Sequence, residues 1–246
     1  MSELFPAKSI AIEVIVSRDP AREFEFNYWH DKVRVPYLRQ LEGIVDVFRY
    51  RDVKPDLGND FTRFTAASGE HTRYLTLYRI NDPDPWRVMQ QATVDEQARG
   101  LFETAEIQDL TAWDFVSVRR SIRDPDRRPT RLPDGMPETL LLYYSNTKPG
   151  RELEHDDWWL NVHAHDLLET PGLVECSRFR TLNPRPAELE AKSIMIYEID
   201  DEDPGAVLLR VLSGDRNVRR PEGRFSTFAG EGDWHGTGLY RHWDLM

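Results

Sequence analysis

The sequence predicts an α+β protein made of two tandem β-α-β-β-α-β units whose antiparallel sheets pack into one barrel within the chain. The first observation is a gap-free repeat at a spacing of 129 residues, which pairs Trp29 with Trp158 and Gly43 with Gly172. A repeat of this length sets the fold before any single residue is considered. The second observation is that both halves show the same order of strand-like and helix-like segments. A unit of this order carries both helices on one face of its sheet, so each bare apolar face can cover the other.

The first half opens with an Ile- and Val-rich segment, residues 9–17, which is typical of a strand. Asp19 and Pro20 mark a helix start, and we expect a helix over 22–41 that Pro36 ends or kinks. The later elements are two strands, a helix that Asp82-Pro-Asp-Pro opens, and a last strand. In chain order they are expected at 44–53, 72–80, 86–104 and 112–120.

The second half repeats this order with a shorter second helix. Its strands and helices are expected at 138–146, 152–169, 173–182, 192–200, 204–213 and 239–246. We therefore assign residues 1–120 to the first unit, 121–137 to a proline-rich linker and 138–246 to the second unit.

Two long segments without periodicity distinguish the halves. They are residues 54–70 in the first unit and the glycine-rich residues 214–238 in the second. Loops of this length are uncommon inside compact domains and often act as lids. A floppy loop or a subunit-contacting loop is the alternative that the sequence leaves open.

Composition excludes several classes of function. A net charge of −11 disfavours nucleic acid as a partner. The sequence has neither the layout of a signal peptide nor an apolar run near the ~20 residues of a membrane span, so we expect a cytoplasmic protein. The single Cys176 excludes an intrachain disulfide and a multi-cysteine metal site. No phosphate loop, dinucleotide fingerprint, G-x-S-x-G motif or zinc spacing is present.

Two segments carry a resemblance to a known family. FNYWHDKVRVP in the first half and DDWWLNVHAHDLLETPG in the second resemble the first-helix motif of the dimeric α+β barrel superfamily, most closely its EthD-like branch. The resemblance covers nearly the whole chain outside the linker and the long loops, and it implies two ferredoxin-like repeats. Relatives of this fold include cofactor-free monooxygenases, isomerases, dehydratases, haem enzymes and proteins without known activity, so the fold alone does not give the function.

The two halves differ at the motif positions where the family usually has Tyr and then His. The first half has His30 and Arg34, and the second has Trp159 and His163. Residues four apart share a helix face. Imidazole transfers protons near neutral pH, and guanidinium binds carboxylate or enolate oxygens. We therefore expect His30, Arg34 and His163 to be catalytic, with Arg34 holding an anion and the histidines acting as base and acid. The alternative is that His30 and Arg34 only make surface or interface hydrogen bonds.

Aromatic side chains are the expected contacts of the substrate. Because strand residues alternate in direction, one row from each strand should line the space between the sheets. The predicted substrate-binding residues are Trp159, Tyr50, Tyr143, Tyr78 and His242. His163 and His165 diverge on a helix and His155 is expected to be exposed, so no metal site is predicted.

The sequence therefore predicts a cofactor-independent lyase or isomerase that acts by acid–base chemistry on an aromatic or polyketide-like small molecule. A homodimer through helices or strand edges is a further expectation. Two alternatives stay open: a cofactor-free monooxygenase of the same fold, and a non-catalytic barrel that binds an aromatic ligand. Haem is compatible with the fold, with His163 or His242 as its ligand, but no motif requires it.

Overall fold

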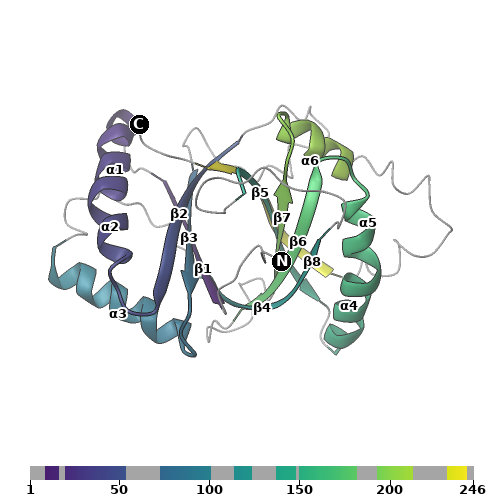
Figure 1. Ribbon diagram of the computed structural model, residues 1–246, viewed down its shortest axis with the longest axis horizontal. Helices are drawn as coiled ribbons and strands as arrows, with labels where there is room; N and C mark the ends of the chain where they lie inside the picture. Colours follow the sequence, from purple (N-terminus) through teal and green to yellow (C-terminus); the bar gives the residue numbers. More distant parts are fainter. Residues whose placement is uncertain are drawn as a thin grey trace.

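Eight strands form one closed ring, and helices cover its two outer flanks (Figure 1). The computed structural model describes residues 9–16, 20–53, 73–100, 114–123, 137–147, 150–181, 193–212 and 232–242. The α+β class predicted from the sequence is confirmed. The boundary between the two units stays a prediction, because most of the expected linker lies outside the described residues.

The first half supplies four strands and the helices of one flank. Its elements are β1 (Ser9–Val16), a 3-10 turn (Pro20–Arg22), α1 (Glu23–Trp29), the π-helical segment η2 (His30–Arg34), α2 (Val35–Leu38), β2 (Ile44–Asp52), β3 (Arg73–Ile80), α3 (Pro85–Ala98) and β4 (Asp114–Arg123). The second half supplies β5 (Thr139–Thr147), α4 (Glu152–Trp158), the π-helical segment η4 (Trp159–His163), α5 (Ala164–Leu168), β6 (Leu173–Thr181), β7 (Ser193–Ile199), α6 (Pro204–Leu212) and β8 (Gly232–His242).

The strands of each half follow the ferredoxin-like order. They run β4-β1-β3-β2 in the first half and β8-β5-β7-β6 in the second, and every pair is antiparallel. Two seams join the halves into a ring. Strands β4 and β6 pair at seven positions, from Val116–Thr181 to Arg123–Glu175. Within the described residues, β2 and β8 pair at three: Tyr50–His242, Arg51–Arg241 and Asp52–Tyr240.

Alternation along the strands divides the core into three clusters. One row of side chains from both halves meets inside the ring: Ile10, Ile12, Phe48, Tyr50, Leu75, Leu77, Leu140, Leu142, Phe179, Ile194 and Ile196. The other row packs beneath the helices, around Tyr78 and Val88 in the first half and around Trp159 and Val207 in the second. Each half therefore has a helix-facing layer of its own.

A π-helical turn interrupts the first helix at the same place in both halves. The N–H of Val35 reaches the carbonyl of His30, and the N–H of Ala164 reaches that of Trp159. Pro36 does not end the helix, which continues from η2 through α2 to Leu38. His165 replaces this proline in the second half and the π turn is still present, so the proline is not its cause. Such turns are frequent at functional sites.

Two predicted boundaries are wrong. Residues 121–123 belong to β4 rather than to a linker, because they pair with β6. Residues 232–238 belong to β8 rather than to a glycine-rich loop, because they pair with β5. In both cases a neighbouring strand extends the ladder into a segment that has no strand pattern of its own. Residues 54–70 and the rest of the second expected loop lie outside the described residues.

Candidate functional site

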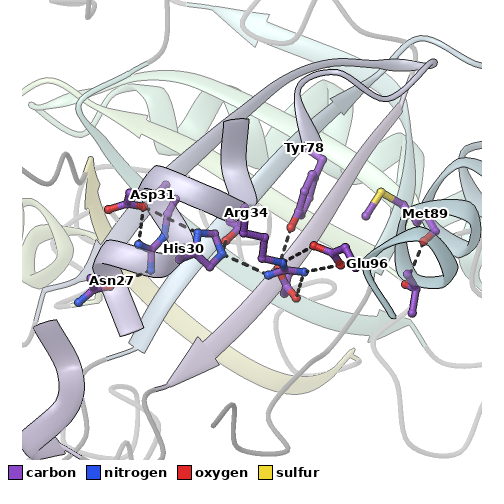
Figure 2. Close-up of polar contacts among 11 residues, drawn as sticks. Asn27, His30, Asp31, Arg34, Tyr78, Met89 and Glu96 are labelled. Atoms are coloured by element: carbon purple, nitrogen blue, oxygen red, sulfur yellow. Dashed lines mark hydrogen bonds and ion pairs between the residues drawn. The ribbon is translucent and has the colours of Figure 1, made fainter. Parts of the chain in front are cut away.

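The first-half flank contains a buried polar network centred on Arg34 (Figure 2). His30 and Arg34 lie on η2, as the four-residue spacing predicted, and the Nη1 atom of Arg34 is 3.2 Å from Nε2 of His30. Both side chains have 0% exposure. Carboxylates reach the guanidinium from two further elements: Glu13 comes from β1, and Glu96 comes from α3. The network therefore ties the helices of this flank to its sheet.

Arg34 uses its full set of donors within the protein. Its Nη1 and Nη2 atoms donate to the two oxygens of Glu13 at 2.7 and 3.0 Å. Its Nε and Nη2 atoms donate to the two oxygens of Glu96 at 2.6 and 3.4 Å. With the contact to His30, the N–H donors of the guanidinium all face protein acceptors. The expected role of Arg34 as a holder of a substrate anion is therefore corrected, because the protein's own carboxylates occupy it.

His30 is a neutral imidazole in this network. Burial lowers its pKa well below the usual range, and the charges of Arg49 and Arg34 lower it further. Its Nε2 atom also lies 3.3 Å from the hydroxyl oxygen of Thr76. Asp31 is 3.7 Å from the Nδ1 atom and pairs with Arg49 at 2.6 Å. The Nε2 atom of His30 thus contacts protein groups, whereas its buried Nδ1 atom has no hydrogen-bond partner within the described residues.

The network carries more negative than positive charge. Burial disfavours the charged guanidinium, but Glu13, Tyr78 and Glu96 outweigh this effect and raise the pKa of Arg34. Burial raises the pKa of Glu96, which the charge of Arg34 partly opposes. Burial also raises the pKa of Tyr78, whose hydroxyl donates to Glu13 at 2.7 Å. A buried group of this kind is stable only while each charge keeps its partners.

Glu13 and Glu96 were not predicted from the sequence, although the position of each in an apolar pattern indicates a buried charge. Glu13 is a single charge inside an Ile- and Val-rich strand, on the side that the helices cover. Glu96 follows Val88 and Ala92 at steps of four, so it occupies a position of the buried face of α3. A charge at an apolar position of a strand or helix indicates a buried partner, which here is Arg34.

The second-half flank has a different set of side chains at the equivalent positions. Trp159 and His163 begin and end η4, and Trp159 is 1% exposed. The ring of His163 is partly exposed and stacks on Trp158, with centroids 4.5 Å apart and planes at 19°. This flank lies across the ring from His30 and Arg34 (Figure 1). The structure therefore does not bring His163 together with the first-half pair, which corrects the expected constellation of three residues.

One buried donor on this flank, the Nε1–H of Trp159, has no hydrogen-bond acceptor within the described residues. The partly buried ring of Tyr143 packs on the same apolar cluster. Burial raises the pKa of Tyr143, so its phenol stays protonated at neutral pH. A buried donor without a partner costs free energy, and a ligand oxygen can remove that cost.

The remaining candidates lie on different faces of the sheet. Tyr50 is inside the ring, and its hydroxyl donates to the carbonyl of Pro137 at 3.3 Å. Tyr78 and Tyr143 face the helices of opposite flanks. His242 pairs with Tyr50 along the β2–β8 seam, and only its backbone is described. The expectation that one row of tyrosines lines the interior thus applies to Tyr50 and not to Tyr78 or Tyr143.

His155 is buried rather than exposed. It is 6% exposed and accepts a hydrogen bond at Nδ1 from Arg178, 3.1 Å away. Burial, and then the charge of Arg178, lowers the pKa of His155 to about 4. This histidine is therefore neutral across the physiological pH range. Its hydrogen bond from Arg178 holds α4 against β6.

No group of three or more His, Cys, Asp or Glu side chains in the described ranges could hold a metal ion. Within the same part of the chain, none of the helices is both long enough and apolar enough to cross a bilayer.

Comparison with known proteins shows the fold. No known protein family matches the sequence, and no curated protein matches it. An anthrone oxidase-like protein superposes with a TM-score of 0.58 at 11% identity, over 99% of this chain and 94% of that one. A candidate monooxygenase from Fusobacterium nucleatum gives 0.53 at 11% identity, over 97% and 94%. A candidate chlorite dismutase gives 0.53 at 14% identity, over 96% of each chain.

Proposed function

We propose that the protein is an enzyme of the dimeric α+β barrel superfamily, on its EthD-like branch, that transfers protons on an aromatic or polyketide-like small molecule without a cofactor. In this proposal the two halves are tandem ferredoxin-like repeats that close one barrel. Equal strand order, the paired π turns and the paired glycines at 43 and 172 support the duplication. The reaction takes place on the second-half flank, between η4 and the sheet.

The observation that carries the proposal is the contrast between His163 and Arg34 at one repeat position. Arg34 is fully buried and saturated by carboxylates, whereas His163 is a partly exposed imidazole held flat against Trp158. Imidazole at such a position can accept and return a proton near neutral pH. Trp159 and Tyr143 supply neutral donors nearby in the same apolar cluster. In this proposal the first-half residues His30 and Arg34 have a structural role.

The proposed chemistry is removal of a proton from a carbon that is conjugated with a carbonyl group, as the methylene carbon of anthrone is through its aromatic rings. His163 takes the proton, the negative charge moves to the carbonyl oxygen, and neutral donors stabilise that oxygen. Return of the proton to another carbon gives an isomerase, and loss of a leaving group gives a lyase. The stacked indole of Trp158 fixes the plane of the imidazole, so the base needs no reorientation during the reaction.

The test is deuterium exchange into the methylene group of anthrone, followed by proton NMR in D2O under argon. The wild-type protein should accelerate the exchange over buffer that contains an equal concentration of free imidazole. The variant His163→Gln should lose about 10²- to 10⁴-fold of that acceleration, which is the usual share of a general base. The matched control is His165→Gln, which removes an exposed histidine from the same helix and should leave the rate unchanged.

A wild-type rate equal to that of the imidazole buffer would overturn the proposal. So would a His163→Gln variant that keeps its rate while its far-UV circular dichroism shows a folded protein.

A second candidate function is oxygenation of the same class of substrate. The names of two of the structural neighbours, the anthrone oxidase-like protein and the candidate monooxygenase, favour it. In that case proton removal comes first and dioxygen then reacts with the carbanion. An oxygen electrode separates the two: anthrone-dependent oxygen uptake that falls in His163→Gln supports the oxygenase, and exchange without uptake supports the lyase or isomerase.

A further inference from the structure

We infer that Arg178 and His155 position the imidazole of His163, because these residues and Trp158 form a continuous column of side chains from strand β6 to the end of η4. We call these four residues the Arg178 column. The inference rests on the proposed function only for the reaction that His163 performs, since the geometry of the column involves no substrate. Arg178 and His155 are positioning residues, which act on the chemistry only through His163.

Each member of the Arg178 column contacts the next. Arg178 is 3% exposed, and its Nη2 atom donates to Nδ1 of His155 at 3.1 Å. Its Nη1 atom lies 2.8 Å from a carboxylate oxygen of Asp156, so the guanidinium is held between two residues of α4. The ring of His155 packs on Trp158, with centroids 5.6 Å apart and planes at 44°. The indole of Trp158 in turn stacks on His163 at 4.5 Å and 19°.

The first half contains an equivalent column with two different members. Arg49 lies over the ring of Phe26 at 5.8 Å. Phe26 packs on Trp29, with centroids 6.5 Å apart, and the guanidinium of Arg34 lies over Trp29 at 5.9 Å. The repeat spacing of 129 makes these four residues the counterparts of Arg178, His155, Trp158 and His163. The column is therefore a feature of the repeated fold, and in the second half both neighbours of the tryptophan are histidines.

The histidine that contacts the arginine changes what the column can do. An imidazole nitrogen accepts a hydrogen bond from a guanidinium, whereas the phenyl ring of Phe26 cannot. The bond from Arg178 fixes the rotation of the His155 ring and leaves its N–H on Nε2. Burial, and then the charge of Arg178, lowers the pKa of His155 to about 4. Trp158 therefore packs against a ring whose plane is fixed and which carries no charge.

The column matters to His163 because this imidazole is partly exposed at the end of a helical segment. An exposed side chain samples several rotamers, and stacking on Trp158 selects one ring plane. The indole face also attracts the imidazolium that forms when His163 takes a proton. A second charged ring against Trp158 would oppose this, and the neutral His155 avoids it. The column thus fixes the plane of the base and accommodates its charge.

The test is the proton NMR spectrum of the His163 imidazole, recorded without substrate and assigned by the loss of its signals in His163→Gln. The ring current of an indole shields protons stacked on it, so these signals should lie upfield of those of the exposed His165. His155→Phe keeps a ring against Trp158 and removes the acceptor for Arg178, so the upfield shift should decrease. His155→Asn keeps an acceptor and removes the ring, and it should decrease the shift as well.

The matched control is Phe26→Leu, which changes the same member of the first-half column and should leave the His163 signals unchanged. Support of α4 alone would not move these signals in a folded protein, so the shift separates positioning from general stabilisation. In the deuterium-exchange assay, His155→Phe should lose up to about 10²-fold of the acceleration, which is the usual cost of a misplaced catalytic group.

Either His155 variant, if it is folded and gives the His163 signals of the wild type, would overturn the inference. A wild type whose His163 signals show no upfield shift would do the same. The spectrum is independent of the exchange experiment. Signals that move in a protein without exchange activity support the column and remove the proposed function, and exchange activity with unmoved signals does the reverse.

Discussion

The two flanks of the ring have the same arrangement of helices and strands but differ in the charge of some buried side chains. At the positions that the π turn and the sheet bring together, the charged Glu13 and Arg34 of the first flank are matched by Tyr143 and His163 in the second. The equivalent pairs are Glu13 and Tyr143, His30 and Trp159, Arg34 and His163, and Tyr78 and Tyr197. One buried arginine on β2 or β6 is common to both flanks: Arg49 pairs with Asp31, and Arg178 pairs with Asp156.

The charged positions predict a difference in sensitivity between the flanks. A buried ion network supports its flank only while it is complete, because the loss of one partner leaves an unpaired charge. The second flank has no carboxylate at the position of Glu13 and no arginine at the position of Arg34. Substitutions at these positions should therefore destabilise the first flank more than the second.

The largest effect is expected when the network loses its centre. Arg34→Met leaves Glu13 and Glu96 buried without their cation and should lower the free energy of unfolding by about 3–5 kcal/mol. The matched change His163→Met on the other flank should cost about 1 kcal/mol or less, since the replaced side chain is partly exposed. Urea unfolding followed by circular dichroism measures both. Equal losses in the two variants would contradict the comparison.

The glycines that end the first helix should be equally sensitive on both flanks. Gly43 and Gly172 have φ values of 92° and 95°, and a Cβ atom there would meet Val88 at 2.8 Å and Val207 at 2.5 Å. Each alanine variant should cost about 1–3 kcal/mol from backbone strain, with the clash added to it. Gly150, with φ of 85° and no atom within 4 Å of a Cβ, reports the strain alone when changed to alanine.

The two glycines would not be equally important if the losses of unfolding free energy in Gly43→Ala and Gly172→Ala differed by more than the smaller of the two losses. If Gly150→Ala cost as much as either, the contacts with Val88 and Val207 would carry no part of the effect.

A smaller effect is expected when the whole charge network is replaced. The triple variant Glu13→Leu, Arg34→Met and Glu96→Leu removes all three charges together and should lie within about 2 kcal/mol of the wild type, on either side. It should therefore be clearly more stable than Arg34→Met alone. A triple variant as unstable as the single one would show that packing, rather than unpaired charge, explains the loss.

The smallest effect is the pH dependence that Glu96 imposes. Burial raises the pKa of Glu96 above its unfolded value of 4.5. For a carboxyl shifted in this direction, the stability it contributes is complete below pH 4.5 and is lost as the pH rises through the folded pKa. The Glu96→Gln variant lacks this loss, so its unfolding free energy relative to the wild type should rise with pH across that window. A difference that does not change with pH for Glu96→Gln would refute the assignment.

The repeat in the sequence contained most of the fold. Its spacing and the order of its segments predicted α+β units of the right kind, because hydrophobic periodicity and glycine positions are local signals. The ends of β4 and β8 were not predictable in this way. Their last and first residues are strand because β6 and β5 offer backbone partners, which is a property of the neighbours and not of the segment itself.

Contacts within one helix turn of the candidate site were predictable from the sequence. The four-residue spacing gave the contact between His30 and Arg34, and the repeat identified Trp159 and His163 as the counterparts. The flank on which each pair lies follows from the arrangement of the whole ring, which one helix does not encode. The partners of Arg34 come from residues 21 and 62 positions away, so the saturation of its donors could be seen only in the structure.

The unequal seams of the ring have a kinetic consequence. The β4–β6 seam is more than twice as long as the β2–β8 seam in the described chain, so separation of the halves should begin between β2 and β8, with β4–β6 as the hinge. Both halves belong to one polypeptide, so this opening and its reversal are unimolecular, and their rates do not depend on protein concentration. Those amide hydrogens of Tyr50 through Asp52 that point to β8 rather than to β3 should therefore exchange with solvent through local opening, whereas those of the longer seam wait for global unfolding. Opening of the β2–β8 seam should therefore determine how often the apolar interior of the ring is exposed to water.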